Sequence, residues 1–215
     1  MKLAVLFSGG KESCFATFWT LNQGFEPVLV TVEPEEYSMM FHHPNIKATR
    51  LQSRAMGLEQ TFVKANDKDW ETKLKTALTK LKAQGIVTGA IASEYQRRRI
   101  ENIGEELGIP TYCPLWHKEE VLIGEMLDYM EVYIIAVSAE GLGPEMLGRP
   151  LSELIAKKVP GIHPLLEGGE GETFVADTPF FKKRIVVKEW KRSWDGVRGV
   201  AEIKKAELVA KKAGK

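Results

Sequence analysis

The first half of the chain alternates between two kinds of hydrophobic pattern. Residues 3–7 form a short apolar run that ends just before a Gly-Gly pair, which is typical of a strand buried on both faces. Residues 11–22 then place large aromatic side chains at helical spacing and predict a helix that ends near Gly24. The same alternation predicts further strands at residues 27–32, 60–63, 86–91 and 111–113, and further helices at residues 45–56, 70–81 and 93–107. Strands separated by helices predict an α/β fold with a doubly wound, mainly parallel five-stranded sheet.

Two of these helices carry boundary signals in the sequence. Asn45 is the expected N-terminal cap of one helix, and Gly57 is its expected end. Ser93 and Gln96, three residues apart, form a capping box that opens another helix, which we expect to end at Gly108. Defined starts and ends at these positions support the α/β interpretation.

The pattern changes after about Pro114, and the second half predicts a smaller α+β domain whose topology the sequence leaves open. We therefore expect two domains, residues 1–113 and residues 114–215. The elements expected in the second are a helix at 119–127, a strand at 132–137, a glycine- and proline-rich loop at 141–150, a further helix, a loop with four glycines at 161–172, and strands at 174–176, 184–188 and 200–203. The basic, helix-favouring tail at 204–215 is expected to be a solvated terminal segment rather than a binding arm.

Charge and cysteine content exclude several classes of protein. The formal net charge is +1, so no global field favours nucleic acid or membrane, and we expect neither as a stable partner. The two cysteines, Cys14 and Cys113, are too few for a disulfide framework or a zinc site and suit a reducing compartment. The chain shows neither a secretory leader nor a long uncharged apolar segment, so a cytoplasmic location is expected.

The segment Ser8–Ser13 (Ser-Gly-Gly-Lys-Glu-Ser) lies between the first expected strand and the first expected helix. Glycines let a backbone approach a polyphosphate closely, and a helix N-terminus offers N–H groups and a positive dipole end. Lys11 adds a cation, and the two serines add hydroxyl donors. The alternative is a plain glycine turn with a serine cap, which the position between strand and helix disfavours. We expect a loop that binds ATP phosphates.

Two familiar glycine motifs do not fit this loop. A Walker loop needs a further glycine where Val5 stands, and a dinucleotide fingerprint needs Gly-x-Gly-x-x-Gly. The segment instead resembles the PP-loop of the ATP pyrophosphatases, Ser-Gly-Gly-x-Asp-Ser. Glu12 departs from that pattern, since it keeps the charge but places it one methylene further out. A role of this carboxylate in holding Mg²⁺ is therefore left open.

The strand order predicts which residues face the phosphate loop. In doubly wound sheets the ligand lies at the carboxyl ends of the strands where strand order reverses. The end of the fourth strand at Ala90 and the following segment 93–97 should face the loop, and Thr31-Val32 should line the adenine side. Arg97 is a candidate to reach a phosphate or an anionic substrate. Ion pairs with Glu101, Glu105 and Glu106 are the alternative for all three arginines at positions 97, 98 and 99.

The chain resembles the diphthine–ammonia ligases, a branch of the PP-loop ATP pyrophosphatases, over nearly its whole length. Four blocks carry the resemblance, namely the phosphate loop, Met40–Asn45, Gly89–Arg97, and Glu167–Thr173 with the following Asp177–Lys183. The Glu-Gly-Gly-Glu-x-Glu-Thr pattern of the last block is the most specific. Gly171 stands within it where relatives usually carry a bulkier residue, which puts local substrate contacts in doubt.

The resemblance implies a fold of the adenine-nucleotide alpha-hydrolase-like (HUP) type in its compact archaeal form. It also implies an activity, the ATP- and Mg²⁺-dependent amidation of diphthine on elongation factor two. The carboxylate would be adenylated and ammonium would supply the amide nitrogen, with release of AMP and pyrophosphate. Two alternatives stay open, a related enzyme with another substrate such as tRNA, and a non-catalytic nucleotide-binding module. The sequence does not decide between a monomer and a homodimer.

Residue roles follow from these patterns and from the resemblance together. A cluster of carboxylates among glycines can orient or deprotonate ammonium or hold Mg²⁺, although a solvated acidic loop is the alternative; the metal ligands are left open. The expected catalytic residues are Glu167, Glu170, Glu172, Glu94 and Arg97. The expected nucleotide-binding residues are Ser8, Gly9, Gly10, Lys11, Glu12, Ser13, Thr31, Val32, His43, Gly89, Ala90, Tyr95, Gln96, Gly168, Gly169 and Thr173. Trp116-His117 can equally shape a substrate crevice or serve packing.

Overall fold

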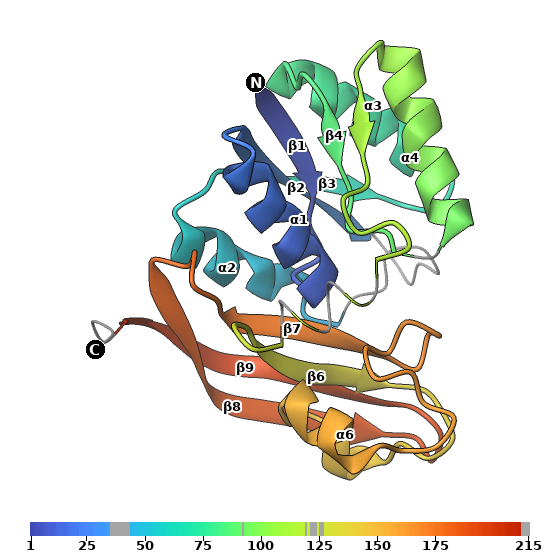
Figure 1. Cartoon of the computed structure of the whole chain (residues 1–215), viewed down its shortest axis with the longest axis vertical. Helices are drawn as coiled ribbons and strands as arrows, with labels where there is room; N and C mark the ends of the chain where they lie inside the picture. Colours follow the sequence, from blue (N-terminus) through green and yellow to red (C-terminus); the bar gives the residue numbers. More distant parts are fainter. Residues whose placement is uncertain (35–43, 92, 119, 121–123, 125–126, 212–215) are drawn as a thin grey trace. The chain divides into compact units, whose positions relative to one another are not determined.

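The computed structural model describes residues 1–34, 44–91, 93–118, 120, 124 and 127–211. These residues form two compact units (Figure 1). The first unit comprises Met1–Ser8, Glu12–Lys47 and Leu58–Glu119, and the second comprises Gly9–Lys11, Ala48–Gly57 and Glu120–Lys215. Two short segments from the N-terminal half of the sequence therefore group with the C-terminal half.

A five-stranded parallel sheet forms the centre of the first unit. Its strands are β1 (Lys2–Leu6), β2 (Glu26–Pro34), β3 (Gln60–Ala65), β4 (Ile86–Val87) and β5 (Thr111–Tyr112). The spatial order is β3-β2-β1-β4-β5, and each neighbouring pair is parallel. The doubly wound sheet with a central first strand is confirmed. The six-residue fourth strand is wrong, because its partners β1 and β5 end at Leu6 and Tyr112 and leave no ladder for a longer β4.

Helices cover both faces of this sheet. Helices α3 (Trp70–Leu81) and α4 (Glu94–Leu107) share one core with the sheet, in which Trp70 and Leu74 pack with Val30. Helix α1 (Lys11–Asn22) lies on the other face (Figure 1), where the ring centroid of Trp19 is 5.6 Å from that of Tyr112 on β5. The sheet is thus buried on both sides, as its continuously apolar strands require.

The helix boundaries confirm some of the sequence signals. The hydroxyl of Ser93 accepts a hydrogen bond from the backbone N–H of Gln96, and Gly57 and Gly108 end their helices in left-handed conformations. The expected cap, Asn45, does not adjoin α2 itself. A 3-10 turn, η1 (Ile46–Ala48), runs directly into α2 (Thr49–Met56), so the helix has no extended capping residue at its start.

The second unit is built on a four-stranded antiparallel sheet with the order β7-β6-β9-β8. The strands are β6 (Glu131–Val137), β7 (Gly171–Asp177), β8 (Lys183–Trp194) and β9 (Gly199–Ala210). Helix α2 packs on β8 and β9, while α6 (Leu151–Lys157) and the 3-10 turn η3 (Pro144–Met146) contact β6. Strand β7 is an edge strand, with β6 as its one neighbour in the sheet.

The hairpin of β8 and β9 is much longer than the sequence predicted. Residues 204–210, expected as part of a solvated helix-favouring tail, form the second half of β9. None of them is fully buried, but the expected helical tendency is wrong. Ile185 on β8 faces Leu208 on β9, so the tail gains a complete ladder and apolar cross-strand partners. Tertiary pairing thus overrides the helix propensity of this lysine- and alanine-rich segment. Most of the helix expected at 119–127 lies outside the described residues.

Candidate functional site

The first unit holds the two ends of the phosphate loop and the end of β4 close together. The hydroxyl of Ser8 donates to that of Ser13 at 3.4 Å. A Cβ on Gly89 would lie 2.7 Å from the carbonyl carbon of Glu12, so only glycine allows this approach of two backbones. Gly89, which follows β4, therefore lies against the start of α1, whereas the expected position of residues 93–97 opposite the loop stays a prediction.

The central residues of the loop, Gly9–Lys11, belong to the second unit. Gly9 adopts a φ of +87°, a conformation that glycine reaches without strain. Its carbonyl oxygen accepts hydrogen bonds from the backbone N–H of Val175 at 3.1 Å and from the side-chain amide of Gln52 at 2.8 Å. The loop backbone is thus fixed by a strand and a helix that are remote in sequence.

Lys11 joins the two glycine-rich motifs of the sequence. Its ammonium group lies 2.9 Å from Oε1 of Glu167, and its backbone N–H donates to the hydroxyl of Thr173 at 3.2 Å. The residue is 4% exposed, so the ion pair is largely sheltered from solvent. A phosphate that binds Lys11 meets a lysine already orientated by a carboxylate.

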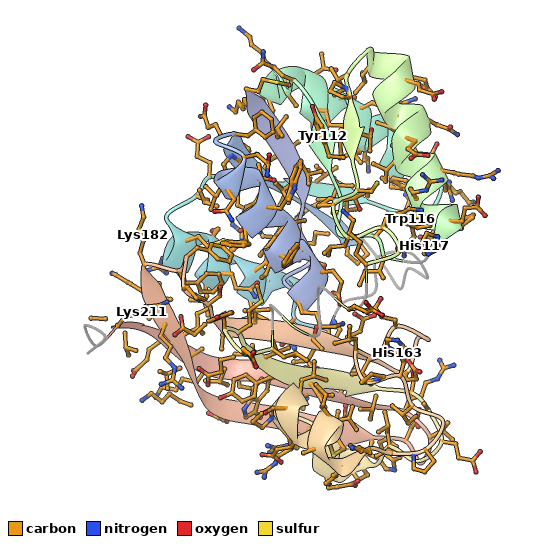
Figure 2. The ribbon with its side chains drawn as sticks, viewed as in Figure 1. Tyr112, Trp116, His117, His163, Lys182 and Lys211 are labelled. Carbon is orange, nitrogen blue, oxygen red and sulfur yellow. The ribbon has the colours of Figure 1, made fainter. Side chains whose placement is uncertain are left out.

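The second glycine-rich loop is organised by Glu170. Its carboxylate accepts backbone N–H groups from His163 at 3.0 Å and from Gly168 at 2.6 Å. Partial burial opposes the charge, but the backbone hydrogen bonds outweigh it and hold the pKa of Glu170 below its usual range. Ser138 donates to the carbonyl of Gly169 at 2.7 Å. Figure 2 shows His163 in this loop.

The three glutamates of the loop thus lie in different environments. Glu167 pairs with Lys11, Glu170 binds its own backbone, and Glu172 is exposed on β7. The structure brings Lys11, Glu167 and Thr173 together in one cluster. Catalytic roles for the three carboxylates stay predictions.

Each of the three consecutive arginines on α4 has a carboxylate partner. Arg98 and Arg99 pair with Glu94 and Glu71 at 2.7 Å in both cases. Arg97 pairs with Glu101 at 2.9 Å. All three side chains are therefore ion-paired, but only Arg97 has one of the expected partners, Glu101. The catalytic role of Arg97 stays a prediction.

Arg97 also belongs to an aromatic cluster after β5. Its guanidinium lies 4.4 Å from the ring centroid of Trp116, whose ring is 4.5 Å from that of His117 (Figure 2). His117 has a φ of +52°, uncommon for a residue other than glycine, and its N–H donates to the carbonyl of Ile91. Burial, and then the charge of Glu101, raise the pKa of the nearby Cys113 thiol. The cluster leaves both interpretations of Trp116-His117 open.

Other residues of the first unit that were expected to bind the nucleotide lie in different environments. The hydroxyl of Thr31 donates to the carbonyl of Phe7 at 2.7 Å and accepts from Gln60 at 2.8 Å. Val32 lies in the core, whereas Tyr95 is 61% exposed. Ala90 is buried near the end of β4. The backbone N–H of Gln96 donates to the hydroxyl of Ser93. His43 lies outside the described residues.

Gln52 is a residue of this region that the sequence analysis did not single out. It lies on the buried side of α2, where Thr49 and Ser53 are also buried. Polar residues at positions i, i+3 and i+4 of a buried helix face are the signal that could have identified it.

The described residues contain no group of three or more His, Cys, Asp or Glu side chains that could hold a metal ion. Among the helices that the structure describes, none is both long and apolar enough to cross a bilayer.

A phosphate-binding type of loop between the first strand and first helix of a doubly wound parallel sheet defines a nucleotide-binding α/β protein. Residues 1–111 match the diphthamide synthase N-terminal domain, and residues 118–209 match the diphthamide synthase C-terminal domain. The chain belongs to the diphthamide synthase family.

Two diphthine–ammonia ligases agree with this assignment. A diphthine–ammonia ligase of Homo sapiens is 33% identical, over 87% of this chain and 83% of the human protein. A diphthine–ammonia ligase of Schizosaccharomyces pombe is 34% identical, over 88% of this chain and 36% of the yeast protein. A solved structure, described as a predicted subunit of tRNA methyltransferase from Methanocaldococcus jannaschii, is 16% identical with a TM-score of 0.49, and covers 83% of this chain and 98% of that chain.

Proposed function

We propose that this chain is a diphthine–ammonia ligase. It uses ATP to adenylate the carboxylate of diphthine on elongation factor two, and ammonium then supplies the amide nitrogen, with AMP and pyrophosphate as products. Relatives with that name cover most of the chain. The observation that carries the proposal is the contact of Lys11 in the phosphate loop with Glu167 and Thr173 in the family's other glycine motif.

The phosphate loop supplies the binding of ATP in this mechanism. Backbone N–H groups at the start of α1, together with the Lys11 ammonium, hold the β- and γ-phosphates and stabilise the charge that develops on the departing pyrophosphate. The diphthine carboxylate then meets the α-phosphate in line, so positioning and charge stabilisation provide the catalysis. No covalent bond to the protein is needed.

Mg²⁺ fits this site as an ion bound mainly by nucleotide. Such an ion commonly takes one or two protein carboxylates and completes its shell with phosphates and water. Within the second unit, Glu167 beside Lys11 and the exposed Glu172 are hard oxygen donors of the required kind, so a dedicated protein cage is unnecessary. The ion would neutralise charge on the leaving pyrophosphate.

The acidic loop is proposed to attract and orientate ammonium. The lowered pKa of Glu170 keeps its carboxylate ionised at neutral pH, where it acts as a charge and a loop anchor rather than as an acid. Glu167 and Glu172 are the remaining candidates to accept a proton from ammonium, since ammonia attacks only after deprotonation.

The two alternative functions have less support. A tRNA substrate would favour a basic protein, and the formal net charge is +1. A non-catalytic nucleotide module would not need the partly buried contact between Lys11 and Glu167. A cytoplasmic location, a homodimer and separate nucleotide and substrate domains at residues 1–113 and 114–215 stay predictions.

The decisive experiment incubates the full chain with ATP, Mg²⁺, ammonium and diphthine-bearing elongation factor two, and measures AMP and the mass of the factor. We expect AMP formation that requires both ammonium and the factor, together with conversion of the carboxylate to the amide. Glu167→Gln should lower the rate strongly, whereas Glu153→Gln, in an exposed pair with Arg149, should not. ADP as product, or AMP formation independent of the factor, would contradict the proposal.

A further inference from the structure

Strand β7 presents an open edge at Val175, where a backbone N–H and a carbonyl point away from β6. Unpaired groups of this kind need partners when they are buried. The N–H of Val175 donates to the carbonyl of Gly9, and its carbonyl accepts from the amide of Gln52 at 2.8 Å. The phosphate loop and a single side chain thus complete the ladder of the edge strand.

Gln52 makes these contacts from a fully enclosed position on α2. Its exposed fraction is 0%, and both acceptors of its amide nitrogen, the carbonyls of Gly9 and Val175, are backbone groups. Its Oε1 has no hydrogen-bond partner among the described residues. A buried amide that leaves one polar atom unsatisfied carries a cost in stability, which its two hydrogen bonds to the carbonyls of Gly9 and Val175 must offset.

The position of the Gly9 carbonyl controls the next peptide group. The peptide between Gly9 and Gly10 is trans and planar, so its C=O and N–H point in opposite directions. With the carbonyl held by Gln52 and Val175, the Gly10 N–H must point away from β7. Gly10 directly precedes α1, at the helix end where N–H groups and dipole favour a phosphate.

We infer that Gln52 is a positioning residue of the phosphate loop, which fixes the Gly9–Gly10 peptide so that the Gly10 N–H is aimed at nucleotide phosphate. The inference rests on the proposed function in that the loop binds ATP. A glycine pair has wide conformational freedom, and the loss of that freedom when ATP binds costs conformational entropy. Gln52 removes that freedom before binding.

The test compares two replacements of similar size with a control on the same helix. Gln52→Met removes both hydrogen bonds and fills the space, whereas Ser53→Ala removes one bond that stays within the helix, to the carbonyl of Arg50. ATP affinity is measured by calorimetry on the full chain with Mg²⁺ and without the protein substrate. We expect binding about tenfold weaker for Gln52→Met and unchanged binding for Ser53→Ala. The melting temperature of Gln52→Met should fall because the Val175 carbonyl loses its partner, so affinity is measured well below the melting temperature of each variant.

Gln52→Glu gives a signature that general loss of structure would not. A protonated glutamic acid can still donate one hydrogen bond to a carbonyl, whereas the ionised form is repelled by the oxygens of Gly9 and Val175 and has a raised pKa in this enclosed site. ATP affinity of this variant should therefore fall as the pH rises, relative to the wild type at each pH. The nearby Lys11–Glu167 pair is common to all variants, so its effect cancels.

The outcomes separate this inference from the proposed function. No ATP binding by the wild type would contradict the function itself. Wild-type affinity in a folded Gln52→Met variant, or a flat pH profile for Gln52→Glu, would overturn the inference alone. Where Gln52→Met does not fold, Gln52→Glu decides at low pH: affinity near that of the wild type supports the role, and affinity that stays weak at every pH overturns it.

Discussion

The protein contains two glycine-rich loops that are held in different ways. The loop around Glu170 is organised locally, because one carboxylate binds backbone N–H groups two and seven residues away. The loop around Gly9 is organised by remote groups, since Val175 and Gln52 lie far along the chain. Glycines permit both conformations, but they select neither. The selecting residues decide how far the shape of a loop can be inferred from its own sequence.

The largest expected effect concerns the lysine that joins the two loops. Lys11→Ala should lower ATP-dependent AMP formation on the order of 10²–10³-fold, because it removes a preorganised cation from the departing pyrophosphate. The measurement is the rate of AMP release at saturating ATP. Lys188→Ala, which removes an exposed lysine paired with Glu207, is the control and should retain the wild-type rate. Full activity of Lys11→Ala would show that the contact between the two loops through Lys11 is not needed for AMP formation.

Gly9→Ala should be the most destabilising single change in the phosphate loop. The new Cβ would overlap Oε1 of Gln52, lie 3.0 Å from Cγ2 of Thr49, and sit at a φ of +87°. Left-handed strain of about 1–2 kcal/mol and overpacking of about 1–3 kcal/mol add to the cost. Gly24→Ala has a φ of +73° and open space around it, so chemical denaturation should show the strain alone. Equal losses of unfolding free energy in the two variants would mean that the Gln52 side chain moves to make room for the methyl group.

Glu170→Gln probes the locally organised loop. The amide can keep one of the two backbone N–H contacts, so a loss of about 1 kcal/mol in the free energy of unfolding is expected, given the partial exposure of the site. The pKa of Glu170 is lowered in the folded state. Its contribution is therefore present above the ordinary carboxyl pKa and is lost as the pH falls through the lowered value. The variant should show a flatter acid limb of stability against pH than the wild type.

The smallest effect is expected for Ser138→Ala. Its hydroxyl donates to the carbonyl of Gly169 at an exposed position, where water can replace the lost donor. The free energy of unfolding should change by about 0.5 kcal/mol or less, with AMP formation retained. A loss as large as that of Glu170→Gln would show that the second loop also depends on a remote partner.

The sequence predicted the first unit better than the second. Apolar runs and helical spacing identified the five strands and their order, because in a doubly wound sheet each strand is followed by the helix that returns the chain. It missed the extent of the β8–β9 hairpin, since Leu208 becomes a strand residue only when Ile185 pairs with it. Asn45 was expected to cap a helix that runs to Met56, but its first turn is the 3-10 turn η1, so Ala48 precedes the α-helix.

For the site, the sequence determined which residue types are present and where the phosphate loop lies, because a serine- and glycine-rich turn between a buried strand and a helix is a local pattern. Only the tertiary structure decided that Lys11 meets Glu167 and that Gln52 holds the carbonyl of Gly9. These contacts join residues separated by 156 and 43 positions. Hydrogen bonds over such distances along the chain depend on packed helices and strands that bring the partners together, and no local pattern encodes them.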